Sequence, residues 1–330
     1  HETLDKIDPE APDYPLVVIT MVESILEDPS AILFKQLDKI KGRAIAAMKE
    51  EGLDYDQRME ELEKLEYPKP NREFIYSSFN EFARQHPWVE EENIRPKSIV
   101  REMFESFRSF DDYIKDYGLE RAEGLLLRHI SSVYKTLSQT VPDSKKNDTI
   151  REIEIYLKTL IQQTDSSLMD EWERMKDPAY QADANKAAVE MPSVVEKDIT
   201  ADEREFTAAV RQLALGFLRG LAYGEINAAF EALNSEEEED SQPSPETVSE
   251  LEGLLDDYFQ NHERIRLDPE ARNQRYSIVQ KQEDRTKWKF QQTLVDPQGL
   301  NDWFVEFDID LTASKQADRP IIQFSKFYNL

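Results

Sequence analysis

Apolar side chains recur every three or four residues through most of residues 1–178, which is the pattern of helices with one buried face. Pro15 favours a helix over residues 15–28, because proline suits a first helical turn. Further helices are predicted at 30–52, 56–65, 71–85, from Pro96 to Gly118, at 117–142, 148–163 and around 166–175. An unbroken series of helices with short joints predicts an all-α helical bundle over residues 1–178.

The helical period stops at residues 179–200, where we expect a linker. The capping-box sequence TADE at 200–203 then predicts a helix of roughly thirty residues, and another helix is expected over 246–262. Four segments that alternate apolar and polar residues follow, and they predict an antiparallel meander: RYSIVQKQ, KWKFQQTLVD, DWFVEFDIDL and PIIQFSKFYN. The stretch SKQADR before the last of them reads as a turn. Residues 201–330 are therefore expected to form a smaller α+β domain, with NTF2-like as the suggested fold.

Composition agrees with a mainly α protein of two domains. Only 9 of the 330 residues are glycine, whereas a mostly β chain needs more turn glycines. A chain of this length also exceeds the size at which one hydrophobic core stops growing. No apolar run approaches the ~20 residues of a membrane span, and no signal peptide opens the chain, so a cytoplasmic protein is expected.

The charge of the chain is strongly negative but unevenly spread. The formal net charge is −27, which disfavours general affinity for phosphate backbones. Residues 95–158 nevertheless hold twelve Lys and Arg against eleven Asp and Glu, and residues 263–330 hold eleven of each kind. Contact with nucleic acid would therefore have to rest on local rows of cations.

Motifs of enzymatic chemistry are missing from the sequence. GxxxxGK[ST], HExxH, GxSxG and GxGxxG do not occur, and the absence of cysteine excludes thiolate-ligated zinc. The four histidines lack the spacing of a metal site, so neither a metal nor a catalytic site is expected. His262 with Asp268 is the best enzymatic pair on offer, although a histidine that satisfies the last carbonyls of a helix is favoured over it.

Cations recur with a seven-residue spacing in YGLERAEGLLLRHISSVYKTLSQTVP, residues 117–142. On a helix this spacing places Arg121, Arg128 and Lys135 along one line, ~10 Å apart. Ser131 is expected near the same side, and Tyr134 could stack on a base, so the row could follow the phosphates of a single strand. The alternative is that acids at the helix start and cations further along only complement the helix dipole.

Several blocks of the chain resemble the C-terminal region of DEAD/DEAH-box, Ski2-like superfamily 2 helicases, a domain of unknown function of the DUF3516 type. They are the quoted segment 117–142, QQTDSSLMDEWERM, HPWVEEENIRPKSIVREM and WKFQQTLVDPQGLNDWFVEFDIDLTAS. The resemblance implies a helical bundle behind two motor domains, with one ratchet helix along the translocating strand. It makes residues 117–142 the ratchet candidate, with Arg121, Arg128 and Lys135 as backbone contacts.

The same resemblance implies single-stranded RNA or DNA as the partner of an ATP-dependent, RNA-directed helicase. The motor domains are absent from this chain, so ATP and Mg²⁺ are expected only in that part of the parent protein. The first residue is His1 rather than Met, which fits a fragment of a longer chain. A free-standing accessory protein is the other possibility.

A secondary set of candidate contacts lies in the α+β half. It comprises Arg264, Arg266, Arg275, Lys287 and Trp288, together with Arg272, Tyr276, Lys281, Arg285 and Lys289. An ordinary exposed sheet face explains these residues equally well. Two rival functions stay open: an acidic scaffold that binds basic proteins without nucleic acid, and a small-ligand enzyme around His262.

Overall fold

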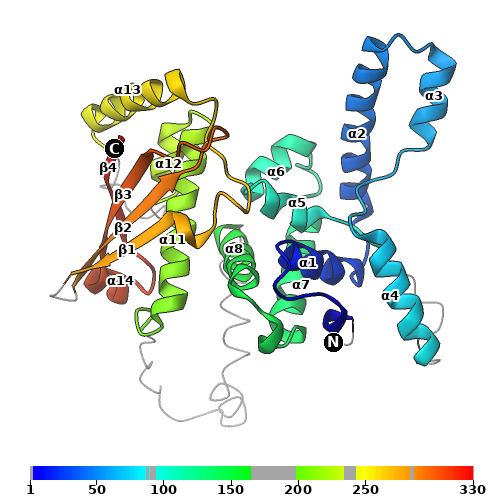
Figure 1. Cartoon of the computed structure of the whole chain (residues 1–330), viewed down its shortest axis with the longest axis horizontal. Coiled ribbons are helices and arrows are strands. Elements are labelled where there is room, and N and C mark those ends of the chain that lie inside the picture. Colours follow the sequence, from blue (N-terminus) through cyan, green and yellow to red (C-terminus); the bar gives the residue numbers. More distant parts are fainter. Residues whose placement is uncertain are drawn as a thin grey trace. The chain divides into compact units, whose positions relative to one another are not determined.

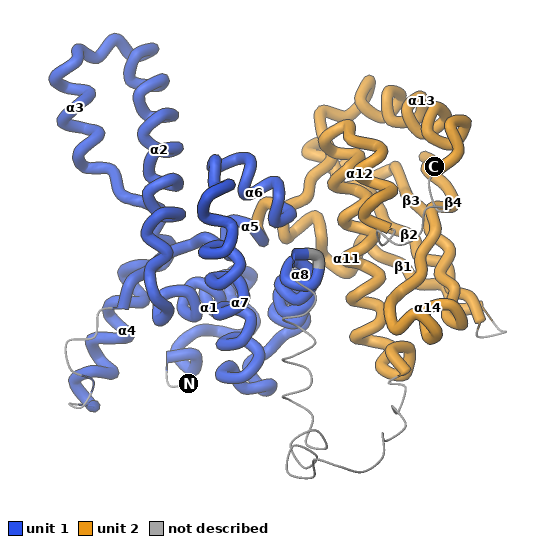
Figure 2. Tube along the Cα trace, turned by 180° about the vertical axis from the view of Figure 1, so that it is seen from behind, with its two compact units in different colours: residues 1–104, 108–187 blue, residues 105–107, 188–330 orange. Residues whose placement is uncertain are grey.

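The computed structural model describes residues 3–86, 89, 94–164, 198–233, 243–282 and 286–329. The chain divides into two compact units, one of residues 1–104 with 108–187 and one of 105–107 with 188–330 (Figure 2). Its described part is mainly helical with one four-stranded antiparallel sheet near the C-terminus, which confirms the predicted fold class. None of these described helices combines the length and apolar character that crossing a membrane requires. The predicted helix around 166–175 and most of the predicted linker lie outside the described residues.

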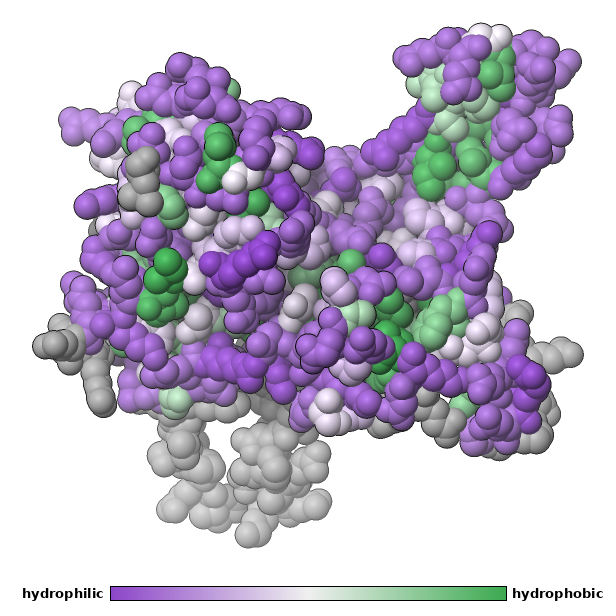
Figure 3. All heavy atoms as spheres, in the orientation of Figure 1, coloured by the Kyte–Doolittle hydropathy of each residue, from purple (hydrophilic) through white to green (hydrophobic). Residues whose placement is uncertain are grey.

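The first unit is built from helices (Figure 1). They are η1 (Leu4–Lys6), α1 (Tyr14–Ser24), α2 (Ser30–Glu50), α3 (Tyr55–Glu63), α4 (Arg72–Gln85), α5 (Ile99–Glu105), α6 (Phe110–Tyr117), α7 (Glu123–Thr140), η2 (Asp143–Lys145) and α8 (Asp148–Thr164). Helix α7 packs against α1 and α8. Helices α2 and α3 form a projecting hairpin that carries apolar surface (Figure 3). Phe34 and Tyr55 are exposed apolar side chains of these two helices.

The helix predicted from Pro96 to Gly118 is in fact two helices, α5 and α6. Phe107, between them, has a φ of 49°, a left-handed conformation that a continuous helix excludes. Ser109 then starts α6 with a capping box, in which its hydroxyl accepts the backbone N–H of Asp112 at 3.1 Å. The Asp112 carboxylate in turn accepts the backbone N–H of Ser109 at 3.3 Å. The helix is therefore divided at this cap, although the apolar stripe continues through both parts.

A buried carboxylate organises the centre of the first unit. Glu23 of α1 accepts the backbone N–H groups of Ile99 and Val100, each at 2.9 Å, and that of Arg101 at 3.2 Å. These are the first N–H groups of α5, which have no partner within their own helix. The imidazole Nε2 of His129, on α7, lies 3.1 Å from the same carboxylate. Helices α1, α5 and α7 thus meet at one fully buried side chain.

The second unit combines helices with the sheet. Its elements are α11 (Glu203–Ala222), α12 (Ile226–Glu231), α13 (Pro245–Asn261), η4 (Gln274–Tyr276), β1 (Ser277–Lys281), β2 (Lys287–Leu294), β3 (Trp303–Asp310), α14 (Leu311–Ala317) and β4 (Ile322–Asn329). The strands pair in chain order, β1-β2-β3-β4, and every pair is antiparallel, as the meander predicts. The predicted turn SKQADR is partly helical, since α14 extends to Ala317. Asp310 caps the start of this helix, because its carboxylate accepts the backbone N–H of Ala313.

The helix predicted to span roughly thirty residues from the TADE sequence is broken into α11 and α12. Gly224 adopts a φ of 71° between them, so α12 folds back onto α11. The cap is also displaced by two residues from Thr200. Asp202 is the N-cap and accepts the N–H groups of Arg204 and Glu205, while the Thr200 hydroxyl donates to Asp198. The predicted capping box at Thr200 is therefore wrong, and the helix starts two residues further along the chain.

The core of the second unit lies between α11, α12 and one face of the sheet. Side chains along β2 and β3 alternate between buried and half-buried, as expected for a sheet covered on one face. The ring of Phe217, on α11, lies 5.4 Å from that of Phe307 on β3 and 5.3 Å from those of Phe230 and Phe324. This aromatic cluster ties both helices to the sheet.

Candidate nucleic-acid interface

The orientation of helix α7 follows from its apolar stripe. Leu126, Ile130, Val133 and Leu137 recur at spacings of four, three and four residues, and all are fully buried. Helix α7 packs against α1 and α8, and Arg128, Lys135 and Gln139, on the side away from the stripe, are exposed. The rotation of α7, and with it the direction of its charged side chains, is set by packing.

Arg128 and Lys135 both lie on the exposed side of α7. Seven residues separate them, so they are about 10 Å apart along the helix axis. Within the described residues, the Lys135 ammonium makes no hydrogen bond or ion pair. Arg128 pairs with Glu27 at 3.5 Å, but their side chains are 74% and 91% exposed. A pair this exposed adds little stability, so Arg128 can exchange it for another anion.

Arg121 does not belong to the helix, which corrects the predicted single row. It lies in the turn between α6 and α7, ahead of Ala122, the N-cap of α7. Its side chain is exposed and, in the part of the chain that the structure describes, has no ion pair. Lys35 of α2 approaches the same turn, with its Nζ 3.9 Å from where a Cβ on Gly118 would lie. The equal spacing in sequence therefore does not give equal spacing along one axis.

Ser131 and Tyr134 are on the wrong side of α7 for the roles predicted for them. Ser131 is 6% exposed and Tyr134 is 9% exposed. Both follow directly after residues of the apolar stripe, Ile130 and Val133, and share their buried side. Ser131 therefore does not lie between the cations, and the Tyr134 ring is not presented to a base.

In the second unit, several predicted contacts are already engaged. The Arg266 guanidinium donates to both carboxylate oxygens of Asp268, at 2.7 and 2.9 Å, and to Glu270 at 3.0 Å. These hydrogen bonds raise the pKa of Arg266 above its usual value. Arg275 lies 3.6 Å from Glu270. Trp288 is only 5% exposed, so it belongs to the core instead of to a stacking surface.

Two of the remaining cations of this set are also paired with acidic neighbours. Lys281 pairs with Glu203 and Lys289 with Glu306, each at 2.5 Å. Arg272 is buried, the ring of Tyr276 is covered by the Arg275 guanidinium, and Arg285 lies outside the described residues. Arg264 and Lys287 are exposed, and no ion pair is found for them among the described residues. Two isolated cations do not form a row, so the first unit is the better candidate.

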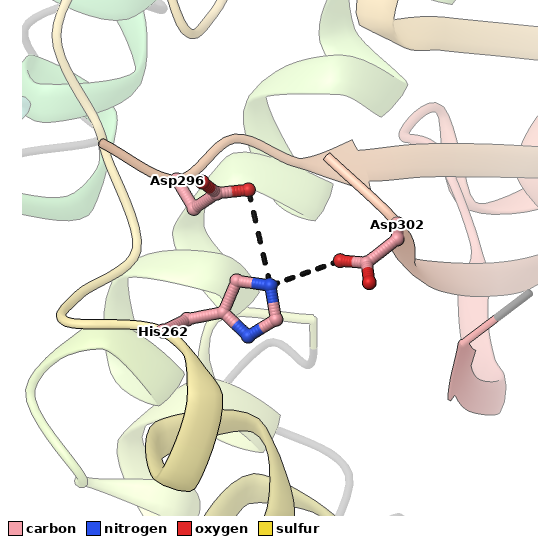
Figure 4. Close-up of side chains that lie close together, drawn as sticks. All are labelled: His262, Asp296 and Asp302. Atoms are coloured by element: carbon pink, nitrogen blue, oxygen red, sulfur yellow. Dashed lines mark hydrogen bonds and ion pairs between the residues drawn. The ribbon is translucent and has the colours of Figure 1, made fainter. Parts of the chain in front are cut away.

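His262 follows the last residue of α13 and is buried, but its partner differs from the predicted one (Figure 4). Its Nε2 lies 2.9 Å from Oδ1 of Asp302 and 4.0 Å from Oδ2 of Asp296. Its Nδ1 lies 3.1 Å from the carbonyl oxygen of Tyr258. The candidate pair of His262 with Asp268 does not form, because Asp268 binds Arg266 instead. The favoured alternative, a histidine that bonds one of the last carbonyls of its helix, agrees with the contact to Tyr258.

Asp296 and Asp302 are the functional candidates that sequence reasoning missed. They flank the loop between β2 and β3, and Asp296 is fully buried. Burial by itself would raise the pKa of Asp296, but the backbone N–H groups of Asn301 and Leu300 outweigh it and lower that pKa. The sequence indicates these residues only by the two aspartates at the ends of DPQGLND. Nothing in that segment predicts that the end of α13 lies beside the loop.

The fold and these sites define a mainly helical protein of two units that is acidic overall and exposes cations on one helix face. The family model described as a domain of unknown function (DUF3516) matches residues 1–327, and the chain belongs to this family. The family match confirms the resemblance at that level and carries no activity with it. No curated protein and no solved structure matched the chain.

Proposed function

We propose that this chain is the C-terminal accessory region of an ATP-dependent, RNA-directed helicase of the Ski2-like group. Its role is to guide single-stranded nucleic acid over the helical unit. The motor domains, with ATP and Mg²⁺, would belong to the same parent chain, and the parent protein would act in the cytoplasm. The observation that supports this proposal is the pair of accessible cations on α7, Arg128 and Lys135.

The position of these cations matters because the chain as a whole repels polyanions. At a net charge of −27, affinity for a phosphate backbone has to come from a local surface where cations are not already paired. Lys135 meets that condition, and Arg128 can exchange its exposed pair with Glu27, on a helix whose rotation is fixed by its buried stripe. Arg121, in the turn before the helix, extends the positive surface, and Lys35 approaches that turn.

The surroundings of the cations indicate what they would recognise. Guanidinium and ammonium groups bind phosphate oxygens, the former through two parallel hydrogen bonds. Because Tyr134 is buried, this face offers no described aromatic ring from α7 on which a base could stack. The contacts would therefore be with the backbone, and binding would not depend on base sequence.

The test is binding of a labelled single-stranded RNA, measured by fluorescence anisotropy over a range of salt concentrations. The variant R121E/R128E/K135E is compared with K49E/R84E/K326E, which reverses three exposed cations elsewhere and has the same net charge. Each phosphate contact contributes about 0.7 to the slope of log affinity against log salt, so the first variant should lower the slope by about 2. Its affinity should fall about tenfold or more, and that of the control much less.

Equal losses in the two triple variants would show that only the total charge matters, and would refute a guiding role for α7. Salt-independent binding of a basic protein in place of RNA would favour the acidic scaffold. In the parent chain, R121E/R128E/K135E should reduce RNA unwinding while ATP hydrolysis at the motor persists.

A further inference from the structure

Three potential metal ligands from separate elements of the second unit meet at the end of α13 (Figure 4). His262 follows α13, Asp296 follows β2, and Asp302 precedes β3. Their ligand atoms all lie within 4.8 Å of one another. We propose that these three residues bind a divalent transition-metal ion of the zinc class, which joins the end of α13 to the loop between β2 and β3.

The two ring nitrogens of His262 both face oxygen atoms that can only accept. Nδ1 faces the carbonyl of Tyr258, which requires a hydrogen on Nδ1. The Nε2 of that tautomer has a lone pair, and it faces the carboxylates of Asp302 and Asp296. Either a proton or a metal ion has to lie between these groups. A histidine that donates Nδ1–H to a backbone carbonyl while Nε2 binds the ion is the usual arrangement in metal sites.

A divalent ion fits this cluster after a small movement of its ligands. Zinc lies about 2.0–2.2 Å from imidazole nitrogen and carboxylate oxygen, so the ligand atoms of a tetrahedral site are about 3.3–3.6 Å apart. Nε2 lies 2.9 Å from Asp302 and 4.0 Å from Asp296, and the three ligand atoms all lie within 4.8 Å of one another, so each separation has to change by only roughly 1 Å. A neutral imidazole with two carboxylates carries a charge of −2, which the ion balances. One nitrogen and two oxygens, without thiolate, suit Zn²⁺ or Mn²⁺.

Neighbouring groups fix the positions of Asp296 and His262, whereas the Asp302 side of the site is open to solvent. Asp296 is oriented by the N–H groups of Leu300 and Asn301, at 3.2 and 2.6 Å. The His262 ring stacks on that of Tyr258, with the ring centroids 4.4 Å apart. The side chain of Asp302, by contrast, is 41% exposed. An ion can therefore enter from solvent, and water can complete its coordination.

The experiment titrates the chelator-treated full chain with Zn²⁺ by calorimetry. We expect one saturable site, and a loss of affinity of tenfold or more in Asp302→Asn. Asp257→Asn removes the same charge from an exposed position on α13 and should leave the affinity unchanged. Co²⁺ bound to the unmodified chain should show visible absorption bands and quench the fluorescence of Trp303, the neighbour of Asp302. This second measurement does not depend on the folding of any variant.

Absence of a saturable site for Zn²⁺ and Mn²⁺ would overturn the proposal. So would equal affinity in Asp302→Asn and Asp257→Asn, because the ion would then be bound elsewhere on the acidic surface. Nitrogen NMR gives a third criterion. If both ring nitrogens of His262 stay protonated with one equivalent of zinc present, the group between imidazole and carboxylate is a proton and the metal site is refuted.

Discussion

At the scale of single residues, the buried carboxylate of Glu23 shows why a charge can be retained in the core. Transfer of a carboxylate from water is costly unless hydrogen bonds replace its hydration. Glu23 accepts three backbone N–H groups at the start of α5 and lies against His129. The positive end of the α5 dipole stabilises it further. A side chain from α1 thus does for α5 what an N-cap normally does.

Removal of this carboxylate should destabilise the first unit. Glu23→Ala leaves three helix N–H groups and His129 without their partner, so we expect a loss of about 3 kcal/mol of unfolding free energy. Glu23→Gln keeps an acceptor oxygen of the same shape and should lose less. Urea denaturation measures both, with the exposed Glu63→Ala of α3 as control. A loss in Glu23→Ala no larger than in the control would contradict the assigned role.

At the scale of secondary-structure elements, α11 and α12 approach so closely that one position admits only glycine. A Cβ added to Gly220 would lie 2.5 Å from the backbone nitrogen, Cα and Cβ of Ala229. A Cβ does not approach non-bonded atoms this closely, so the two helices would have to separate. The glycine therefore allows α12 to pack directly against α11, although glycine weakens an isolated helix.

Alanine substitution should consequently have opposite effects at two helical glycines of the same unit. Gly220→Ala forces α12 away from α11 and should cost about 1–3 kcal/mol. Gly253→Ala, on α13, meets nothing within 4 Å and should stabilise by up to about 1 kcal/mol. Thermal and urea denaturation compare the two variants. If Gly220→Ala does not destabilise the protein, the close contact between α11 and α12 is not present in solution.

At the scale of the whole molecule, the chain holds two separate cores. One surrounds Glu23 among the helices of the first unit, and the other is the aromatic cluster around Phe217 in the second. Each core has its own buried apolar side chains and its own hydrogen-bonded network. Two cores of this kind favour two unfolding transitions over one cooperative transition.

The two variants described above can test this independence. Glu23→Ala should lower the midpoint of one calorimetric transition and leave the other in place. Gly220→Ala should do the converse, since its contact lies in the second unit. A single transition that both substitutions lower together would show that the two units unfold as one body.

Much of the fold could be predicted because it rests on short-range patterns. The periods of 3.6 and 2 located the helices and the four strands, and the stripe on α7 indicated its buried side. Element ends were less predictable, because single residues decide them. Ser109 divides one predicted helix and Gly224 another, through a cap and a left-handed turn that compete with continuous apolar stripes.

The residues of the candidate sites could be predicted only where their spacing along one helix determines which side they occupy. Arg128 and Lys135 share the exposed face of α7, as their seven-residue separation indicates. The prediction that places Arg121 on this helix is wrong, because α7 starts after it. The prediction that Tyr134 stacks on a base is also wrong, because its ring lies on the buried side with the apolar stripe. Nothing in the sequence distinguishes a buried aromatic ring from an exposed one at the edge of such a stripe.

The sequence by itself determined the mainly helical class, the meander, the strong negative charge and the absence of thiolate ligands. These properties depend on composition and on neighbours within a few residues. The tertiary structure alone decided which charges meet. It paired Lys289 with Glu306 across two strands and brought His262 to Asp302, 40 residues further along the chain. The reason is physical: side-chain chemistry fixes what a residue can bind, but only the packing of distant segments brings a partner within reach.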